Sequence, residues 1–519
     1  MPDPAPNQTP PGAVAYARHP APSGEFLGHP KGLFVLFSTE LWERFSFYSM
    51  RGIMTLYMVN VVLVAMAAQE GAEKAGGFAD QVYGAYVGFV YSATFIGGML
   101  ADRLLGQRRA IYIGGILMSL AHFTLTTHAL LVSSTYKPGE LNFLFYLGLG
   151  LLACGNGFFK PNISTIVGTL YEQQDARRDG AFTIFYMGIN IGAMISSFSS
   201  GAAEKWGWYL AYLLAGIGMI VSLVIMFTGR NWIQGRGLPP AGARLLGPGR
   251  FGVPNVLPLL IGVLVFIPLA AYLMSVPRYV QGLATIIAVP VLAYLLFECY
   301  RATREEGGRM FVIIVLCMFS MVFWGFFELQ GSTVIRFAAQ HINMRVLGWE
   351  LPTAWVVNFI NPFLIILLGI PFSWLWVWLD RKHIEPSTPL KFSLGLLQLG
   401  LGFLVLWIPA LQARDGGQGP LIWLLLGFLL FTTGELCLSP VGLSMVTKLA
   451  PARLVGVFMG MWFLSSALAN VITGGVVGPM TAKLGYAPVF LRIGAMAGGA
   501  ALLLFLLTPL LKRLMHGVK

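Results

Sequence analysis

Charge is scarce in this sequence. Asp, Glu, Lys and Arg make up 11% of the 519 residues, whereas a soluble domain devotes about a quarter of its residues to them. Hydrophobic residues make up 56%, and there are 62 glycines. So little charge cannot cover the surface of a soluble enzyme or binding module. The composition therefore predicts an integral membrane protein with closely packed spans.

Metal-binding and nucleophilic patterns are also missing. The sequence contains neither HExxH nor Gly-x-Ser-x-Gly, the patterns of zinc proteases and serine hydrolases. His122 and His128 have no evident partner in the sequence. The cysteines lie singly in apolar runs without ligand spacing, at Cys154, Cys299, Cys317 and Cys437. We predict no metal, no cofactor and no enzymatic activity; an intramembrane enzyme would need one of these clusters.

Acidic residues are fewer than basic ones, and the net charge is +12. A nucleic-acid-binding protein gathers such charge on one polar face, but here Lys and Arg lie mostly at the ends of apolar segments. The predicted first outer loop carries Glu70, Glu73 and Asp80 against Lys74 alone. By the positive-inside rule, both termini are cytoplasmic and the number of spans is even. The bilayer is thus a partner and nucleic acid is not.

Fourteen apolar segments are long enough to cross a bilayer, which takes about 20 helical residues. They lie near 31–64, 82–103, 108–133, 141–170, 181–202, 207–229, 254–275, 279–300, 309–338, 353–378, 390–411, 420–448, 454–479 and 486–511. Five prolines interrupt the pair at 254–300. We expect a flexible tail at 1–30, a six-helix bundle at 31–229, a linker with two inserted helices at 230–307 and a second six-helix bundle at 308–519.

Two Asp-Arg loops mark corresponding places in these halves. ADRLLGQRRA at 101–110 follows the second segment, and LDRKHIEPSTPLK at 379–391 follows the segment at 353–378. Paired halves around a site at mid-membrane are typical of secondary transporters. GGMLADRLLGQRR also resembles the Gly-x-x-x-Asp-Arg-x-x-Gly-x-Arg-Arg loop of the major facilitator superfamily. An ordinary basic loop at the inner face is the alternative.

The first apolar segment carries four charges, at Glu40, Glu43, Arg44 and Arg51. Each charge at bilayer depth costs roughly 2.5–3.5 kcal/mol on insertion scales. At about 100° per residue, these four and Tyr48 fall within an arc of roughly 140°. The helix is thus predicted to turn a charged stripe toward protein or water and an apolar back toward lipid. Such a stripe indicates a transport site.

Three more ionisable residues lie in other predicted spans: Lys160, Glu328 and Glu435. A structural ion-pair network inside the first segment is the alternative to a transport site, but it does not require charges in three further spans. A Lys near a helix end also extends to the interface, which is the alternative for Lys160. Intramembrane carboxyl groups commonly carry protons in transporters.

Amide and aromatic side chains accompany these charges. They are Asn190, Asn358, Asn361, Tyr48, Tyr91, Tyr186, Trp324 and Trp462. Each alone fits a packed core or an interfacial belt. Together with charges of both signs, they predict a cavity with a cationic and an anionic pole. A zwitterion with an apolar middle would match such a cavity.

Two motifs give these residues a family resemblance. ELWERFSFYSMR at 40–51 resembles the Glu-x-x-Glu-Arg-Phe signature of proton-dependent oligopeptide transporters, and FYMGINIG at 185–192 is similar to their Phe-Tyr-x-x-Ile-Asn-x-Gly element. The resemblance covers nearly the whole chain. Departures are small: Phe47 stands where Tyr is usual and Ser49 where Gly is usual.

The resemblance implies an all-α major facilitator fold with fourteen spans, as in bacterial members. It also implies symport of protons with di- and tripeptides across the bacterial cytoplasmic membrane, by a functional monomer. Residues expected in proton coupling are Glu40, Glu43, Arg44, Lys160 and Glu328. Residues expected at the peptide are Arg44, Tyr48, Arg51, Tyr91, Lys160, Asn190, Trp324, Glu328, Asn361, Glu435, Trp462 and Ser466.

Other carriers of the same fold, for nitrate or a drug, are the nearest alternative. A channel would show a repeated filter, whereas the charges here are scattered over several spans.

Overall fold

The computed structural model describes residues 24–517 except 138, 173–174, 176, 241–244, 246, 248–252, 414–415 and 452–453. Side chains at 179, 439–441, 443–444, 447 and 456 are also outside this description. Most of the tail predicted at 1–30 and part of the 230–307 linker therefore lie outside the described residues.

Helices occupy all fourteen predicted segments. They are α1 Lys31–Arg51, α2 Met54–Tyr57, α3 Val64–Glu70, α4 Ala72–Leu100, α5 Gln107–Ser134, α6 Asn142–Thr169, α7 Arg177–Trp206, α8 Tyr209–Thr228, α9 Val256–Ser275, α10 Pro277–Arg301, α11 Arg304–Phe327, α12 Thr333–His341, α13 Thr353–Arg381, α14 Thr388–Gln412, α15 Ile422–Leu449, α16 Val455–Leu484 and α17 Tyr486–Leu514. Within the described ranges, twelve helices are long and apolar enough to span a membrane, and a bent pair at the N-terminus adds a thirteenth. In α15, side chains are described without interruption over Ile422–Leu438, and this stretch is apolar.

Short irregular turns and strands connect the described helices. The turns include η1 Met58–Val62 and η2 Ala101–Leu105, which are π-helical, and η3 Gly229–Ile233 and η4 Glu328–Gly331, which are 3-10 turns. The strands form three two-residue pairs. They are β1 Glu25–Phe26 with β2 His29–Pro30, β3 Ile342–Asn343 with β6 Gly419–Pro420, and β4 Arg345–Val346 with β5 Trp349–Glu350.

Local sequence explains several helix boundaries. The Thr303 hydroxyl accepts the N–H of Glu306 at 3.3 Å and so caps α11, because a helix leaves its first N–H groups unpaired. Pro277 is the first residue of α10, where its missing N–H costs nothing. Gly485 separates α16 from α17 at φ 77°, a conformation that favours glycine.

The first predicted span is not one straight helix. Continuous helix ends at Arg51, and the chain bends by 62° between η1 and α3. A Cβ on Gly52 would lie 2.5 Å from the amide nitrogen of Asn358. The break thus occurs where Gly52 lies directly against the Asn358 side chain, which a larger residue at this position would have to displace.

The predicted first outer loop is also shorter than expected. Helix α4 begins at Ala72, so Asp80 lies within it and is fully buried. Asp80 Oδ2 accepts Arg336 Nη2 at 2.6 Å and the Thr333 hydroxyl at 2.7 Å. Its assignment to a loop was wrong because the sequence alone does not show that its partners lie 253 and 256 residues away.

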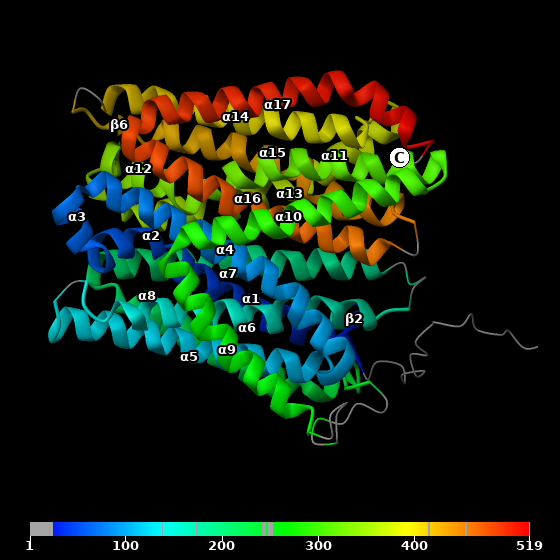
Figure 1. Ribbon diagram of the computed structural model, residues 1–519, viewed down its shortest axis with the longest axis horizontal. Coiled ribbons are helices and arrows are strands. Elements are labelled where there is room, and N and C mark those ends of the chain that lie inside the picture. The colour runs from blue at the N-terminus through cyan, green and yellow to red at the C-terminus, as the bar shows by residue number, and fades with distance from the viewer. Residues whose placement is uncertain are drawn as a thin grey trace, which may run out of the picture.

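The helices form two groups that lie one above the other in Figure 1. Helix α1 packs on α7 and α8, and α5 packs on α6 and α8, whereas α14 packs on α15 and α17. The groups meet where α4 packs on α16 and α7 packs on α13. Strand β2 and the C-terminal end of α17 lie at one end of the molecule, with α3 and β6 at the other. The residue boundaries predicted for the two halves remain a prediction.

The apolar back of α1 does not face lipid, contrary to the expectation. Val35 and Phe45 lie on the side opposite the charges at about 100° per residue. Both side chains are buried, because α7 and α8 flank the helix. Hydropathy alone could not decide this, since lipid tails and protein side chains are equally apolar.

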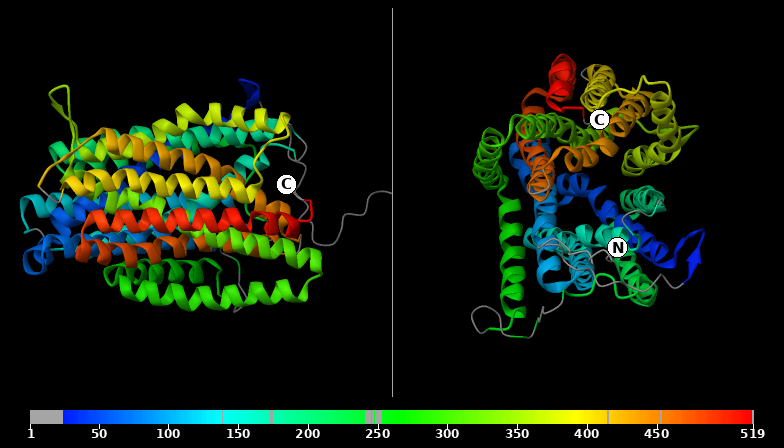
Figure 2. Two further views of the ribbon diagram at one scale, coloured as in Figure 1. Left: turned by 90° about the horizontal axis from the view of Figure 1, so that it is seen from above. Right: turned by 90° about the vertical axis from the view of Figure 1, so that its right-hand side faces the viewer.

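The inserted helices α9 and α10 lie along the outside of the two groups (Figure 2). Helix α9 packs on α6, and α10 packs on α11 and α16. The Ile267 carbonyl of α9 reaches so close to Gly150 that a Cβ there would lie 2.5 Å away. Most of the remaining surface of this pair is exposed.

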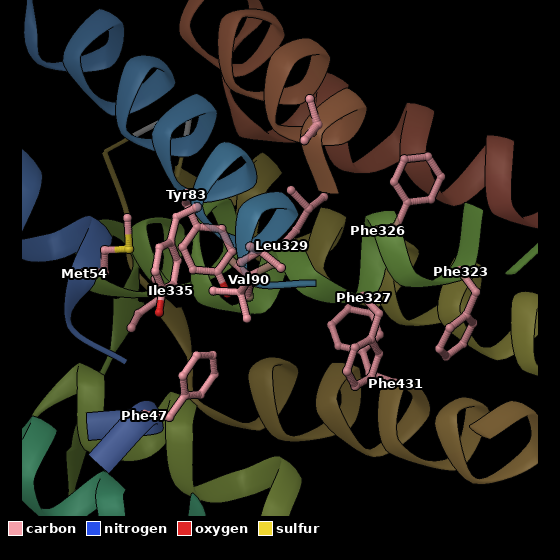
Figure 3. Close-up of a cluster of buried hydrophobic side chains, with 14 of the residues drawn as sticks. Phe47, Met54, Tyr83, Val90, Phe323, Phe326, Phe327, Leu329, Ile335 and Phe431 are labelled. Carbon is pink, nitrogen blue, oxygen red and sulfur yellow. The ribbon is translucent and has the colours of Figure 1, made fainter. Parts of the chain in front are cut away.

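Buried apolar side chains from both groups meet around the centre of the molecule (Figure 3). Phe47 and Val90 come from α1 and α4, and Phe327 and Phe431 come from α11 and α15. These side chains form part of one continuous core. The buried charged and polar groups described below are exceptions within this apolar core.

Adjacent glycines on α4 offer a test of this close packing. A Cβ on Gly97 would lie 2.0 Å from the Gly157 carbonyl oxygen, whereas one on Gly98 would meet Pro161 at an ordinary 3.6 Å. Gly97→Ala should lower the free energy of unfolding by about 1–3 kcal/mol through overpacking. Gly98→Ala, the matched control, should leave it unchanged or raise it by about 0.5–1 kcal/mol. Thermal unfolding of the purified proteins measures both, and equal effects would contradict the α4–α6 contact.

Candidate functional site

A cavity of about 280 Å³ lies between the two helix groups. Helices α1, α4, α6 and α7 line it from one group, and α11, η4, α13 and α15 line it from the other. Five charged residues are among the lining: Arg44, Arg51, Lys160, Glu328 and Glu435. The sequence-predicted charges of four spans therefore do converge on one chamber.

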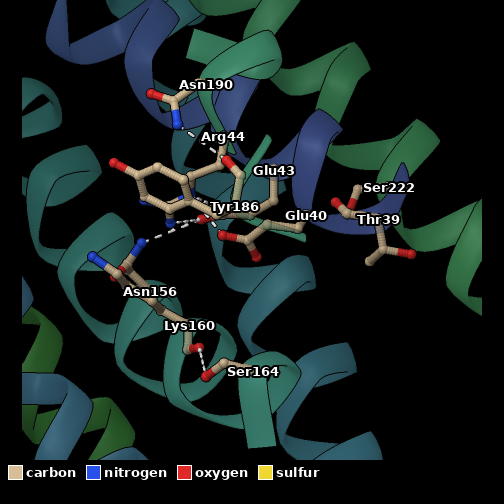
Figure 4. Close-up of polar contacts among 10 residues, drawn as sticks. All are labelled: Thr39, Glu40, Glu43, Arg44, Asn156, Lys160, Ser164, Tyr186, Asn190 and Ser222. Carbon is tan, nitrogen blue, oxygen red and sulfur yellow. Dashed lines mark hydrogen bonds and ion pairs between the residues drawn. The ribbon is translucent and has the colours of Figure 1, made fainter. Parts of the chain in front are cut away.

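Arg44 is held by two carboxylates of its own helix. Its Nε and Nη2 donate to Glu43 at 2.5 and 2.6 Å, and Nε lies 3.2 Å from Glu40 Oε1. Asn156 of α6 donates to Glu43 Oε1 at 3.2 Å. The second oxygen of Glu40 is buried without a partner among the described residues. All four side chains are buried, and Figure 4 shows how they face one another.

Lys160 lies near this cluster but is not paired with it. Its Nζ lies 5.0 Å from the centre of the Tyr91 ring, and no described carboxylate comes within 4 Å of it. Helix α6 continues past Pro161 to Thr169, so Lys160 lies inside the span and not at its end. This placement excludes the alternative in which Lys160 extends to the membrane surface.

Arg51 joins the two helix groups. Its Nη2 donates to Glu328 of η4, and its Nε donates to the Tyr83 hydroxyl at 2.6 Å. Tyr48 lies beside it, 5.6 Å from the guanidinium carbon to the ring centre. Breaking a buried pair of this kind leaves an uncompensated charge, which typically costs about 3–5 kcal/mol.

Glu435 is on the α15 side of the cavity. Asn361 of α13 donates to Glu435 Oε2 and lies within hydrogen-bond distance of the Thr432 hydroxyl, both at 3.0 Å. The amide thus holds one carboxylate oxygen in place. No cation lies within ion-pair distance of Glu435 among the described residues, so this carboxylate is available to a bound amino group.

The charges divide the cavity into two poles. Arg44 and Lys160 come from α1 and α6, and Glu435 comes from α15 in the other group. Apolar and aromatic side chains line the space with them; they include Phe47, Val87, Val90, Tyr91, Ile189, Trp324, Phe327 and Ile365. Such an arrangement suits a small molecule with a carboxylate, an amino group and variable side chains between them.

Most predicted site residues line the cavity. They are Arg44, Tyr48, Arg51, Tyr91, Lys160, Asn190, Trp324, Glu328, Asn361 and Glu435, with Tyr186 and Asn358. Glu40 and Glu43 lie behind Arg44 and contact it. The cavity also includes residues that the sequence did not single out, such as Val87, Val357 and Ile365; no local motif distinguishes these from other residues of apolar spans.

Trp462 and Ser466 do not line the cavity in this structure, which corrects their expected placement. Both side chains are buried in α16. The Trp462 ring lies 6.4 Å from that of Phe392 and covers Gly442 so closely that a Cβ there would lie 2.2 Å away. The indole therefore faces α14 and α15, because α4 occupies the other side of α16.

The two histidines have partners within the core. Ser46 donates its hydroxyl hydrogen to the Ala215 carbonyl at 2.7 Å, so it accepts from His122 Nε2 at 2.8 Å. His128 Nδ1 lies 2.6 Å from the Tyr57 hydroxyl. Neither lies in a metal-binding cluster, and the described part of the chain has no group of three His, Cys, Asp or Glu that could hold a metal ion.

Outside the membrane spans, a polar cluster holds the start of α7 beside strands β1 and β2. Arg177 pairs with Glu25 at 2.8 Å and with Asp175 at 2.9 Å. Hydrogen bonds from Arg177 keep the pKa of Asp175 below its usual value. Burial raises the pKa of Tyr171 to about 12, so its hydroxyl stays protonated beside His29, 2.8 Å away.

Comparison with known proteins places this geometry in a family. The model of the POT family matches residues 108–487. The peptide transporter YePEPT of Yersinia enterocolitica is 36% identical over 513 residues, covering 95% of this chain and 97% of the relative. A di-/tripeptide transporter of Lactococcus lactis is 35% identical over 463 residues, covering 86% and 89%. The crystal structure of peptide transporter POT in complex with sulfate aligns with a TM-score of 0.79 at 34% identity, covering 96% and 98%.

The chain belongs to the POT family. Its fold is therefore the major facilitator fold of that family, and it is a multi-pass membrane transporter. The two extra helices of the fourteen are α9 and α10. In this POT protein, the motif at 40–51 supplies Arg44 and Arg51 to the cavity from one helix.

The positions of Trp324 and Trp462 predict different effects of their removal. Trp462→Ala should lower the free energy of unfolding by about 3–5 kcal/mol, because it empties a packed site. Trp324→Ala should cost clearly less, since its ring borders the cavity. Thermal denaturation of the two purified variants, which exchange the same residue types, gives the comparison. Equal destabilisation would mean that Trp462 is no more tightly packed than Trp324.

Proposed function

We propose that this POT protein is a proton-coupled symporter that imports di- and tripeptides by alternating access. The observation that carries the proposal is the cavity with cations on one side and a free carboxylate on the other, contributed by two helix groups. Its relatives in Yersinia enterocolitica and Lactococcus lactis are a peptide transporter and a di-/tripeptide transporter, which supports a peptide as the substrate.

We place the protein in the cytoplasmic membrane of a bacterium, as a functional monomer with both termini cytoplasmic. The distribution of basic loops supports this orientation. The cavity would then face the side of the termini, since Tyr186, near the start of α7, lines it and is 41% exposed.

The two termini of the peptide bind at opposite poles of the cavity. Arg44 and Lys160 bind the carboxylate, and Asn190, Asn361 and Glu435 bind the amino group. Tyr48, Tyr91 and Trp324 border the side-chain space. The family assigns Trp462 and Ser466 to this space as well; a contact with them requires α16 to change its packing.

The proton acts on the carboxylates that hold these cations. Arg44 is held by Glu43 and Glu40 in the structure. Protonation of Glu43 cancels its attraction for Arg44 and frees the guanidinium for the peptide, while Lys160 is the alternative partner of the ionised carboxylate. Glu328 likewise holds Arg51, so its protonation loosens a contact between the groups. The proton is thus the coupling ion, and we propose no cofactor.

One proton is enough to drive accumulation. It supplies about 2.3 kcal/mol per 100 mV of membrane potential and about 1.4 kcal/mol per pH unit. At 100 mV and one pH unit the sum is roughly 3.7 kcal/mol. At about 1.4 kcal/mol per decade, this sustains on the order of 500-fold accumulation of a neutral dipeptide.

Uptake into proteoliposomes with an imposed pH gradient tests the function. Labelled dialanine should accumulate only when the gradient is present, and unlabelled dialanine should compete with it. Nitrate or a cationic drug should not compete. Competition by nitrate without competition by dialanine would favour the other carriers of this fold.

The same assay tests the coupling residues. Glu43→Gln and Lys160→Ala should each abolish gradient-driven accumulation, because the switch of Arg44 and Lys160 between carboxylates is lost. Lys74→Ala is the control, since Lys74 pairs only with Glu70 at the surface and should accumulate normally. Full pH-dependent accumulation by Glu43→Gln or Lys160→Ala in correctly inserted protein would remove these residues from the coupling mechanism.

Glu435 should recognise the amino terminus. Glu435→Gln is expected to weaken binding of free dialanine about tenfold or more, as expected when a charged hydrogen-bond partner is lost. Binding of N-acetylated dialanine, which carries no positive charge, should change much less. Calorimetry of both ligands makes the comparison, and equal losses would refute the assignment.

A further inference from the structure

Two backbone ends face each other where the helix groups meet. The N-terminus of α13 leaves its first N–H groups without helical partners, and the break after α1 leaves carbonyl groups without them. Both ends lie at the α7–α13 contact, beyond the cavity from the side of the termini. Side chains from the opposite group bind each of them.

Glu204, near the end of α7, binds the start of α13. Its Oε1 accepts the N–H of Thr353 at 3.2 Å, and its Oε2 accepts the N–H of Ala354 at 2.8 Å. These are the first two residues of α13. One carboxylate therefore satisfies two N–H groups and adds a negative charge at the positive end of the helix dipole.

The sequence of α13 provides no such cap itself. Pro352 occupies the N-cap position without a side-chain hydrogen bond, and the first turn has no acidic residue. Proteins in general favour a local Ser, Thr, Asp or Asn at this position, as Thr303 does for α11. Here the cap comes from the other helix group, 149 residues earlier in the chain.

Asn358 makes the reciprocal contact. Its Nδ2 donates to the Gly52 carbonyl after α1 at 3.1 Å and to the Ala354 carbonyl at 2.7 Å. Gly201, three residues before Glu204, lies against Trp355 so closely that a Cβ on Gly201 would be 2.8 Å from the Trp355 Cβ. The Glu204 charge and the close packing at Gly201 thus fix α13 to α7, and the Asn358 amide fixes it to the break after α1.

Farther along, the same two helices border the cavity. Tyr186 and Asn190 line it from α7, and Asn361 and Ile365 line it from α13. The contact around Glu204 therefore lies between the cavity and the end of the molecule opposite the termini. Under alternating access, this end must open for the substrate to enter.

We propose that Glu204 is a gating residue that caps α13 from the opposite helix group and keeps this end closed. Opening the end moves α7 away from α13, so both N–H groups must exchange the carboxylate for water. Solvent already reaches the Glu204 side chain, so the exchange costs little enough to be reversible. This inference rests on the proposed alternating access.

Accessibility of a cysteine in the cavity measures the closed state directly. Ala193→Cys places a reporter among the lining residues, in a full-length chain whose four native cysteines are replaced. A membrane-impermeant maleimide is added outside intact cells. Glu204→Gln, which removes the charge and one acceptor, should raise the labelling rate about three- to tenfold, in line with the usual worth of a helix cap.

Thr353→Pro gives an independent test from the other partner. Proline is tolerated at the first position of a helix, and Pro352 already has the extended conformation, ψ 131°, that proline requires of the preceding residue. The variant removes one capped N–H without removing Glu204, and should also label faster. Lys205→Gln, which removes the adjacent charge on α7 without touching the cap, should label as the parent does.

Labelling at the parent rate in both Glu204→Gln and Thr353→Pro would overturn the cap. If one variant fails to fold, shown by a lost thermal transition, the other decides. The assay uses neither peptide nor pH gradient. Faster labelling of the variants without dialanine transport in proteoliposomes would therefore reject the symport and retain the cap. Dialanine transport with unchanged labelling of both variants would retain the symport and reject the cap.

Discussion

The cost of an unpaired charge away from water governs the centre of this molecule. Arg44 is buried, and Glu43 and Glu40 hold it on its own helix. Because an isolated ion there is expensive, Arg44 can leave Glu43 only when another anion takes its place or the carboxylate becomes neutral. A substrate carboxylate is such an anion, and a proton makes the carboxylate neutral. Binding and protonation are thereby linked through one guanidinium.

Much of this site could be predicted from the chain alone. The stripe of Glu40, Glu43 and Arg44 follows from helical periodicity, and contacts between residues one and four positions apart are local. Charges in apolar segments are rare enough to mark Lys160 and Glu435 wherever they fold. The fourteen helices follow from segment length, because a helix must match the thickness of the bilayer.

What could not be predicted depends on contacts between distant segments. The sequence shows that Trp462 lies in a span, but not that α4 turns it toward Phe392 and away from the cavity. Asp80 looked like a loop residue because Arg336 is far along the chain. The cap on α13 was equally hidden, since Glu204 follows no capping pattern in its own segment.

The inserted pair has a mechanical consequence. Helix α9 is attached to α6 and helix α10 to α11 and α16, while a single residue, Val276, connects them. If the two helix groups rotate against each other, the angle between α9 and α10 at Val276 has to change with them.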